Sequence, residues 1–149
     1  TRLCGQTKPP CCGQDTPVIV DTSAWAALFR ATGTPAHARL RQALRRQEPV
    51  FMLEVVYQEL LQGARDAGHF IRLQTELDAV PLWSPVDSLE LHRQAAMLYA
   101  RCRWRGITVR SPHDYVIAAS AIEAGLPLLH DDRDFAALAQ AAPQLTFVN

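Results

Sequence analysis

The sequence predicts an α/β fold, a three-layer α/β/α sandwich around a mostly parallel sheet. Short runs rich in Val, Ile and Leu alternate with longer segments whose apolar residues recur at helical spacing. Such alternation favours parallel strands joined by helical crossovers, which place helices on both faces of the sheet. The chain has 149 residues, of which 48% are hydrophobic. This is enough for one compact domain with its own core.

The first half of the chain predicts two strands, each followed by helices. The first strand covers 17–20, a β-branched run typical of a strand buried on both faces, and Asp21 ends it. Thr22 or Ser23 is expected to cap the helix that follows. The remaining elements of this half are a helix over 36–47, a strand over 50–53, a helix from 55 to 63 and a helix around 70–77.

The second half predicts two helices that open with a Ser-Pro pair. Ser is a good N-cap and Pro suits the first helical position, so helices are expected to start at Ser84 and Ser111. The first runs to about Arg105, and Gly125 closes the second. The remaining elements are a short strand over 80–82, a strand over 126–129, a short helix over 134–141 and a final strand over 145–148.

Residues 1–16 show no periodic pattern, and we expect a flexible N-terminal extension before a domain over 17–149. The extension holds three of the four cysteines, including the adjacent pair Cys11 and Cys12. An adjacent pair lacks the spacing of a zinc site, so reduced thiols in a cytoplasmic protein are expected. No apolar run is long enough to span a bilayer, and no signal-peptide pattern is present.

Charge and motifs exclude several classes of function. The formal net charge is zero, which excludes binding of polyanions by bulk charge but allows a local basic face. The one lysine is Lys8, in the extension, so a P-loop or a response-regulator receiver site is excluded. There is no GxGxxG dinucleotide fingerprint. A haloacid-type phosphatase needs DxDx[TV], whereas Asp21 precedes Thr22 and Ser23.

Four carboxylates are expected near the carboxyl edge of the sheet. Asp21 and Asp132 follow strands, Asp114 lies in the first turn of a helix, and Glu59 lies on the helix after the second strand. Ligands bind beyond the carboxyl ends of parallel strands, so we expect the four acids to converge there. Converging carboxylates repel one another unless a cation is bound, and Mg²⁺ or Mn²⁺ prefers oxygen ligands. The pattern indicates metal-assisted phosphodiester hydrolysis.

Each of these acids also has a purely structural interpretation. Asp114, three residues after Ser111, fits a capping box. Asp21 can cap the helix that starts beside it. Glu59 can be a solvent-facing helix residue, and the acids within 131–134 can be turn residues.

Four segments resemble the motifs of PIN-domain nucleases, and in particular the VapC-type toxins of type II toxin–antitoxin pairs. They are VIVDTSAW at 18–25, YQELLQG at 57–63, DYVIAA at 114–119 and LLHDDRDF at 128–135. The resemblance spans residues 18–148 and implies a PIN-like fold.

The resemblance also implies a Mg²⁺- or Mn²⁺-dependent endoribonuclease. Its metal ligands would be Asp21 and Asp114, and Asp132 would complete the acidic pocket. Glu59 would hold a second ion or orient the attacking water. Ser23 stands at a small-hydroxyl position that supports the first acid in the family.

The sequence departs from the family pattern at two positions. His130 stands where the family often has Thr or Ser, and Asp131 where Asn is common. The extra carboxylate of Asp131 is either a metal ligand or an exposed spectator. The cysteine-bearing extension has no counterpart in the pattern.

The resemblance further implies an RNA substrate, a cognate antitoxin and a homodimer. In the family, an antitoxin segment lies in an apolar groove and often presents arginine to the acidic pocket. That groove, unless its residues are simply core, would be formed by Trp25, Leu28, Phe29, Leu60 and Leu61. Three arginines are expected either to contact RNA or to lie on a solvated helix face: Arg39, Arg45 and Arg46. The alternative function is a catalytically silent PIN-like scaffold that binds a protein or RNA; the presence of all four acids argues against it.

Overall fold

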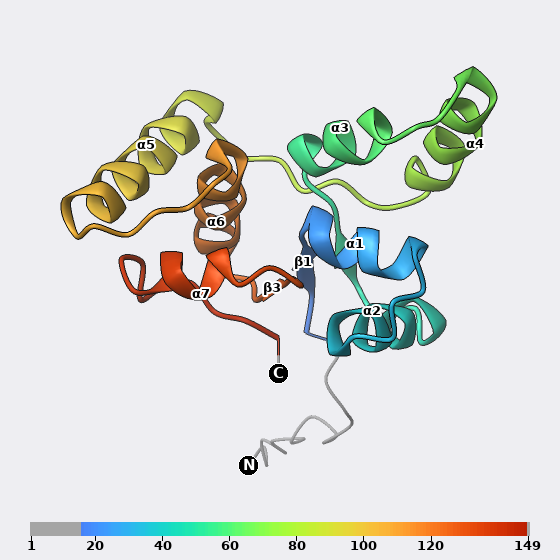
Figure 1. Ribbon diagram of the computed structural model, residues 1–149, viewed down its shortest axis with the longest axis horizontal. Helices are drawn as coiled ribbons and strands as arrows, with labels where there is room; N and C mark the ends of the chain where they lie inside the picture. The colour runs from blue at the N-terminus through green and yellow to red at the C-terminus, as the bar shows by residue number, and fades with distance from the viewer. Residues whose placement is uncertain (1–15, 149) are drawn as a thin grey trace, which may run out of the picture.

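The computed structural model describes residues 16–148, and Figure 1 gives its ribbon trace. The predicted flexible extension, with Lys8 and the adjacent cysteines, therefore lies outside the described residues except for residue 16. The boundary between extension and domain stays a prediction. The fourth cysteine, Cys102, is a buried free thiol.

A parallel sheet forms the centre of the fold. Its strands are β1 (Val18–Val20), β2 (Val50–Phe51) and β3 (Leu128–Leu129), in the order β2-β1-β3. Every residue of β1 is buried, because strands flank it on both edges and helices cover both faces. This explains why the strand sequence is continuously apolar.

Single parallel bridges extend the sheet at both edges. Met52 pairs with Leu82 beyond β2, and Leu128 pairs with Phe147 beyond β3. The predicted strands over 80–82 and 145–148 are therefore reduced to one bridged residue each.

Helices cover both faces of the sheet, which confirms the predicted three-layer α/β/α class. The helices of the described residues are α1 (Thr22–Phe29), α2 (Pro35–Arg45), α3 (Glu54–Gln62), α4 (Ala67–Leu77), α5 (Ser88–Trp104), α6 (Pro112–Ala124) and α7 (Asp134–Ala139). Figure 1 shows α1 to α4 on one side of the strands and α5 to α7 on the other. Strand β2 lies on one side of β1 and β3 lies on the other. Because crossovers between parallel strands are right-handed, connections that run in opposite directions across the sheet place their helices on opposite faces.

Two helix starts differ from the prediction. The N-cap of α1 is not Thr22 or Ser23 but Asp21, as the structural interpretation of that acid allowed; its side chain accepts a hydrogen bond from the backbone of Ser23. Helix α5 begins after Asp87 rather than at Ser84, because the backbone N–H of Trp83 bonds to Met52 and holds that segment at the sheet edge. Asp87 then supplies the cap by accepting from the backbone of residue 90.

Helix α6 starts and ends as predicted. Ser111 is its N-cap and accepts a hydrogen bond from the backbone of His113. Gly125 closes it with φ +63°, a left-handed conformation that disfavours a Cβ. Among residues 16–148, no helix is both long enough and apolar enough to cross a membrane.

Candidate active site

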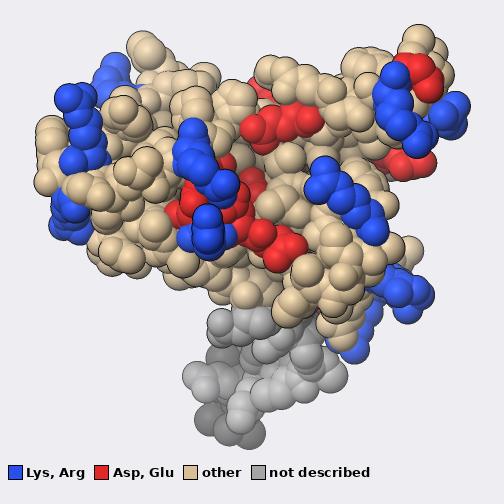
Figure 2. Space-filling model, in the orientation of Figure 1, with Lys and Arg blue, Asp and Glu red and all other residues tan. Residues whose placement is uncertain are grey.

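The four predicted acids line one cleft of about 350 Å³. Figure 2 shows acidic side chains gathered at the centre of one face, with cationic side chains beside them. The cleft lies beyond the carboxyl ends of β1 and β3, where the chain connections run in opposite directions from β1. Such a switch point is where parallel α/β sheets bind ligands. The fold thus brings Asp21, Glu59, Asp114 and Asp132 together, as the sequence predicted.

Asp21 is fixed in place by Ser23. The Asp21 carboxylate accepts hydrogen bonds from the Ser23 backbone N–H at 2.9 Å and from the Ser23 hydroxyl at 2.5 Å. The same hydroxyl accepts from the backbone N–H of Asp131 at 2.8 Å, which ties β1 to the loop after β3. Burial raises the pKa of Asp21, and the bonds from Ser23 partly oppose that rise. Ser23 therefore supports the first acid, and Asp21 is both helix cap and cleft residue.

Asp114 is the least compensated acid of the cleft. Its side chain is only 9% exposed. Burial first, and the negative charges of Asp21 and Asp132 next, raise its pKa to about 7. The capping-box interpretation fails, because within the described residues only the Ser111 side chain caps this helix end.

Asp134 is a member of the site that sequence reasoning missed. Oxygens of Asp114, Asp132 and Asp134 all lie within 4.8 Å of one another. The sequence offers for Asp134, as for Asp131 and Asp132, the interpretation of a turn residue, and the family resemblance assigns it no role. Its spacing from Asp132, with one residue between them, was the available signal.

Arg110 joins the acids at the rim. Its Nε donates to Asp134 at 2.9 Å and its Nη2 to Asp132 at 3.3 Å. These contacts hold the pKa of Asp134 below its ordinary value. The Arg110 side chain is still 66% exposed, so a cationic surface faces solvent beside the acids.

Glu59 lies on the cleft wall, outside the tight cluster of three carboxylates. It accepts a hydrogen bond from the Thr22 hydroxyl, and its other oxygen lies 2.7 Å from Nδ1 of His113. These partners come from α1 and α6, so they fix the carboxylate of α3 between the two. Neither partner has a direct signal in the amino-acid sequence.

The two departures from the family pattern are explained by their contacts. Asp131 is exposed and accepts a hydrogen bond from Thr34 at 3.0 Å, which favours the spectator interpretation. His130 packs against Phe135 and Phe147. Its Nδ1 accepts from the backbone N–H of Asp132 at 3.2 Å, so the ring positions the Asp132 loop, and burial lowers the pKa of the imidazole.

The donor set of the cleft fits a hard divalent cation. Its clustered ligands are all carboxylate oxygens, which suit Mg²⁺ or Mn²⁺ and not a softer metal. Burial and then the neighbouring carboxylates raise the pKa of Asp114 to about 7, and a bound cation would offset both effects by favouring the ionised form.

The predicted antitoxin groove is partly wrong in its membership. Phe29 and Leu60 line a groove of about 690 Å³ that also includes Glu59. Trp25 and Leu61 instead belong to the buried core. Leu60 is buried as well, and Leu28 packs partly buried against the core, so Phe29 is the one of the five that is largely exposed.

Of the arginines predicted to contact RNA, Arg39 is already paired. Its Nη2 lies 2.7 Å from Glu48, and its side chain is largely buried. Arg45 and Arg46 are exposed.

Comparison with known proteins agrees with the fold and the cleft. Residues 18–141 match the model of the PIN domain family. VapC ribonuclease Mb1587 of Mycobacterium bovis and ribonuclease VapC11 of Mycobacterium tuberculosis are each 36% identical over 124 residues, which is 83% of this chain and 92% of theirs.

Solved structures share the fold at lower identity. VapBC-1 from nontypeable Haemophilus influenzae has a TM-score of 0.68 and 17% identity, covering 90% of this chain and 98% of that one. DNA-bound VapBC from Salmonella typhimurium has a TM-score of 0.64 and 18% identity, covering 89% and 97%.

An acidic cleft at the switch point of a parallel sheet defines the general class, an α/β protein with a cluster of carboxylates at the carboxyl edge of its sheet. The chain belongs to the PIN domain family and, within it, to the VapC ribonucleases. The family resemblance drawn from the four motifs is confirmed.

Proposed function

We propose that this protein is a metal-dependent endoribonuclease that acts as the toxin of a toxin–antitoxin pair. The observation that carries the proposal is the group of three carboxylates, Asp114, Asp132 and Asp134, whose oxygens lie within 4.8 Å of one another. The ribonuclease names of the relatives at 36% identity support the substrate class.

Mg²⁺ or Mn²⁺ would be held by Asp21 and Asp114, with Asp132 and Asp134 completing the pocket. Such an ion supplies charge neutralisation at the phosphodiester and lowers the pKa of a water molecule. The protein does not need a covalent nucleophile for this chemistry.

The surrounding side chains divide the remaining tasks. Ser23 keeps the Asp21 carboxylate oriented, since it donates two hydrogen bonds to it. Glu59, fixed by Thr22 and His113, orients the attacking water. Arg110 holds Asp134 and presents the exposed part of its planar guanidinium to a phosphate.

The test is cleavage of RNA with and without Mg²⁺ or Mn²⁺, compared with Asp21→Asn and Asp114→Asn. Asn still caps a helix, so Asp21→Asn keeps the start of α1 while removing a carboxylate. Asp131→Asn is the matched control, because Asp131 is an exposed neighbour outside the cleft lining. We expect cleavage by wild type and the control, and none by the other two. Equal cleavage by all four proteins would trace the activity to a contaminant and overturn the proposal.

An antitoxin is the proposed protein partner. The groove lined by Phe29 and Leu60 reaches Glu59, so a bound segment would lie beside the acidic cleft. The structural similarity to VapBC from Haemophilus influenzae and Salmonella typhimurium supports this proposal. The homodimer and the cytoplasmic location stay predictions.

The catalytically silent scaffold is the alternative function. Retention of RNA binding without cleavage, by wild type and Asp114→Asn alike, would favour it over the nuclease.

A further inference from the structure

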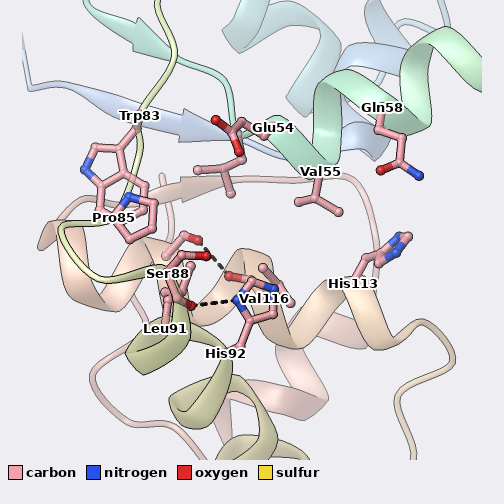
Figure 3. A pocket seen from close by; sticks show the side chains of 12 residues that line it. Glu54, Val55, Gln58, Trp83, Pro85, Ser88, Leu91, His92, His113 and Val116 are labelled. Carbon is pink, nitrogen blue, oxygen red and sulfur yellow. Dashed lines mark hydrogen bonds between the residues drawn. The ribbon is translucent and has the colours of Figure 1, made fainter.

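A second cavity of about 310 Å³ lies next to the acidic cleft, between α3, α5, α6 and the segment 83–88. Figure 3 shows Trp83 and Pro85 at one end of it, and Gln58 and His113 at the other. Glu54 lies on the α3 side. Trp83, Pro85 and Gln58 do not line the acidic cleft.

Two helices connect this cavity to the acids. His113 lines the cavity, and its Nδ1 lies 2.7 Å from Glu59, which lines the acidic cleft. His113 precedes Asp114 on α6, and Gln58 precedes Glu59 on α3. A nucleotide adjacent to a phosphodiester in the cleft is therefore within reach of the cavity.

The lining suits a flat, uncharged ring with polar edges. Trp83 supplies an aromatic face, and Val55 and Val116 supply apolar contacts. The Glu54 carboxylate and the Gln58 amide are exposed and form no hydrogen bond with the other residues drawn in Figure 3. A nucleobase can stack on an aromatic side chain while its edge bonds to such groups.

Charge argues against a phosphate as the occupant. None of the described residues that line the cavity is Lys or Arg, and Glu54 is acidic. A carboxylate accepts hydrogen bonds only, so it favours a base with N–H donors at its edge. Guanine presents two adjacent donors on its Watson–Crick edge.

We propose that this cavity is a base-recognition subsite that takes an unpaired guanine next to the cleaved bond, through stacking on Trp83 and hydrogen bonds to Glu54 and Gln58. The inference rests on the proposed ribonuclease function and adds a substrate preference to it.

The first experiment is a cycle of protein and RNA changes. Short RNAs carrying a mapped cleavage site are compared with the same RNAs bearing an abasic nucleotide at each position beside the bond. In wild type we expect one abasic position to lower kcat/KM by about tenfold or more, as expected for loss of a stacked base. In Trp83→Leu, which keeps an apolar side chain against the core, that penalty should disappear, so that the abasic and the intact RNA have about the same kcat/KM. Trp104→Leu, at the far, exposed end of α5, is the matched control and should keep the full penalty.

The second experiment tests base identity. Glu54→Gln should reduce the preference for guanine over the other bases by about tenfold, because the charged acceptor is lost. Glu123→Gln, an exposed acid on α6 away from the cavity lining, should leave the preference unchanged.

Binding of the same RNAs to Asp114→Asn reports on the cavity without cleavage. If wild type does not cleave but the abasic nucleotide still weakens binding to this variant, the nuclease fails and the subsite stands. An abasic penalty that is equal in folded wild type and folded Trp83→Leu overturns the subsite and leaves the nuclease intact. A change from dimer to monomer in Trp83→Leu, with the penalty unchanged, identifies a second copy as the occupant and also overturns it.

Discussion

Replacing Asp114 with Asn should make the metal-free protein more stable while abolishing cleavage. Burial and neighbouring carboxylates raise the pKa of Asp114 from 3.8 to about 7. The ionised side chain therefore destabilises the folded state. The full shift in the pKa of Asp114 corresponds to a destabilisation of the folded state by about 4 kcal/mol at pH 8. Screening by solvent in the open cleft reduces this destabilisation, and we expect Asp114→Asn to raise the free energy of unfolding by about 1–2 kcal/mol.

The sign of the effect depends on pH. Well below pH 3.8 Asp114 is protonated in both the folded and the unfolded chain, so it contributes no difference. As the pH rises from 3.8 to about 7, the unfolded chain ionises first and the folded state loses stability. Above pH 7 the destabilisation is constant. The advantage of Asp114→Asn should therefore be complete at pH 8 and small near pH 4.

Thermal unfolding in EDTA measures this advantage. A gain of about 1–2 kcal/mol raises Tm by about 3–6 °C in a chain of this size. Asp131→Asn, which changes an exposed acid outside the cleft lining, should leave Tm unchanged. An Asp114→Asn variant that is no more stable than wild type at pH 8, or whose gain is undiminished at pH 4, would refute the electrostatic reasoning.

Three further predictions concern the metal, the rim and a helix end. Mn²⁺ at about 100 times its Kd should stabilise wild type by about 2.7 kcal/mol at pH 8 and by much less at pH 5. Asp114→Asn should gain no stability from Mn²⁺. Calorimetric scans that show equal gains for both proteins would contradict the assignment of Asp114 as a metal ligand. Arg110→Met should let the pKa of Asp134 rise toward its ordinary value and lower RNA affinity, so carboxyl titration by NMR and filter binding should both change. Gly125→Ala should destabilise the fold by about 1 kcal/mol, since φ is +63° there; an unchanged urea midpoint would show that the backbone adapts.

Local signals predicted the elements better than their edges. Ser111 and Gly125 marked both ends of α6, because a side-chain cap and a left-handed residue act within one helical turn. Ser84 carried the same start signal and failed. The bond from Trp83 to Met52 joins residues far apart in the sequence, and that tertiary contact overrides the local preference.

Strand ends and motif spacing were enough to predict the four acids of the candidate site. The four acids converge because the carboxyl ends of parallel strands share an edge. Asp134 and Arg110 were not predictable in this way, since their roles depend on how the loop before α6 meets the start of α7. The partners of Glu59 likewise depend on the packing of three helices.

The double duty of Asp21 limits how this protein can lose its activity and remain folded. Most substitutions of Asp21, such as Asp21→Ala, remove the cap of α1 together with a cleft oxygen, and only another capping residue such as Asn avoids this, whereas no substitution of Asp114 removes a helix cap. If expression of the chain arrests growth, cells that survive through an intact but harmless copy should carry changes at Asp114 more often than at Asp21. A folded variant with a change at Asp114 would keep the groove lined by Phe29 and Leu60, where we propose that an antitoxin binds.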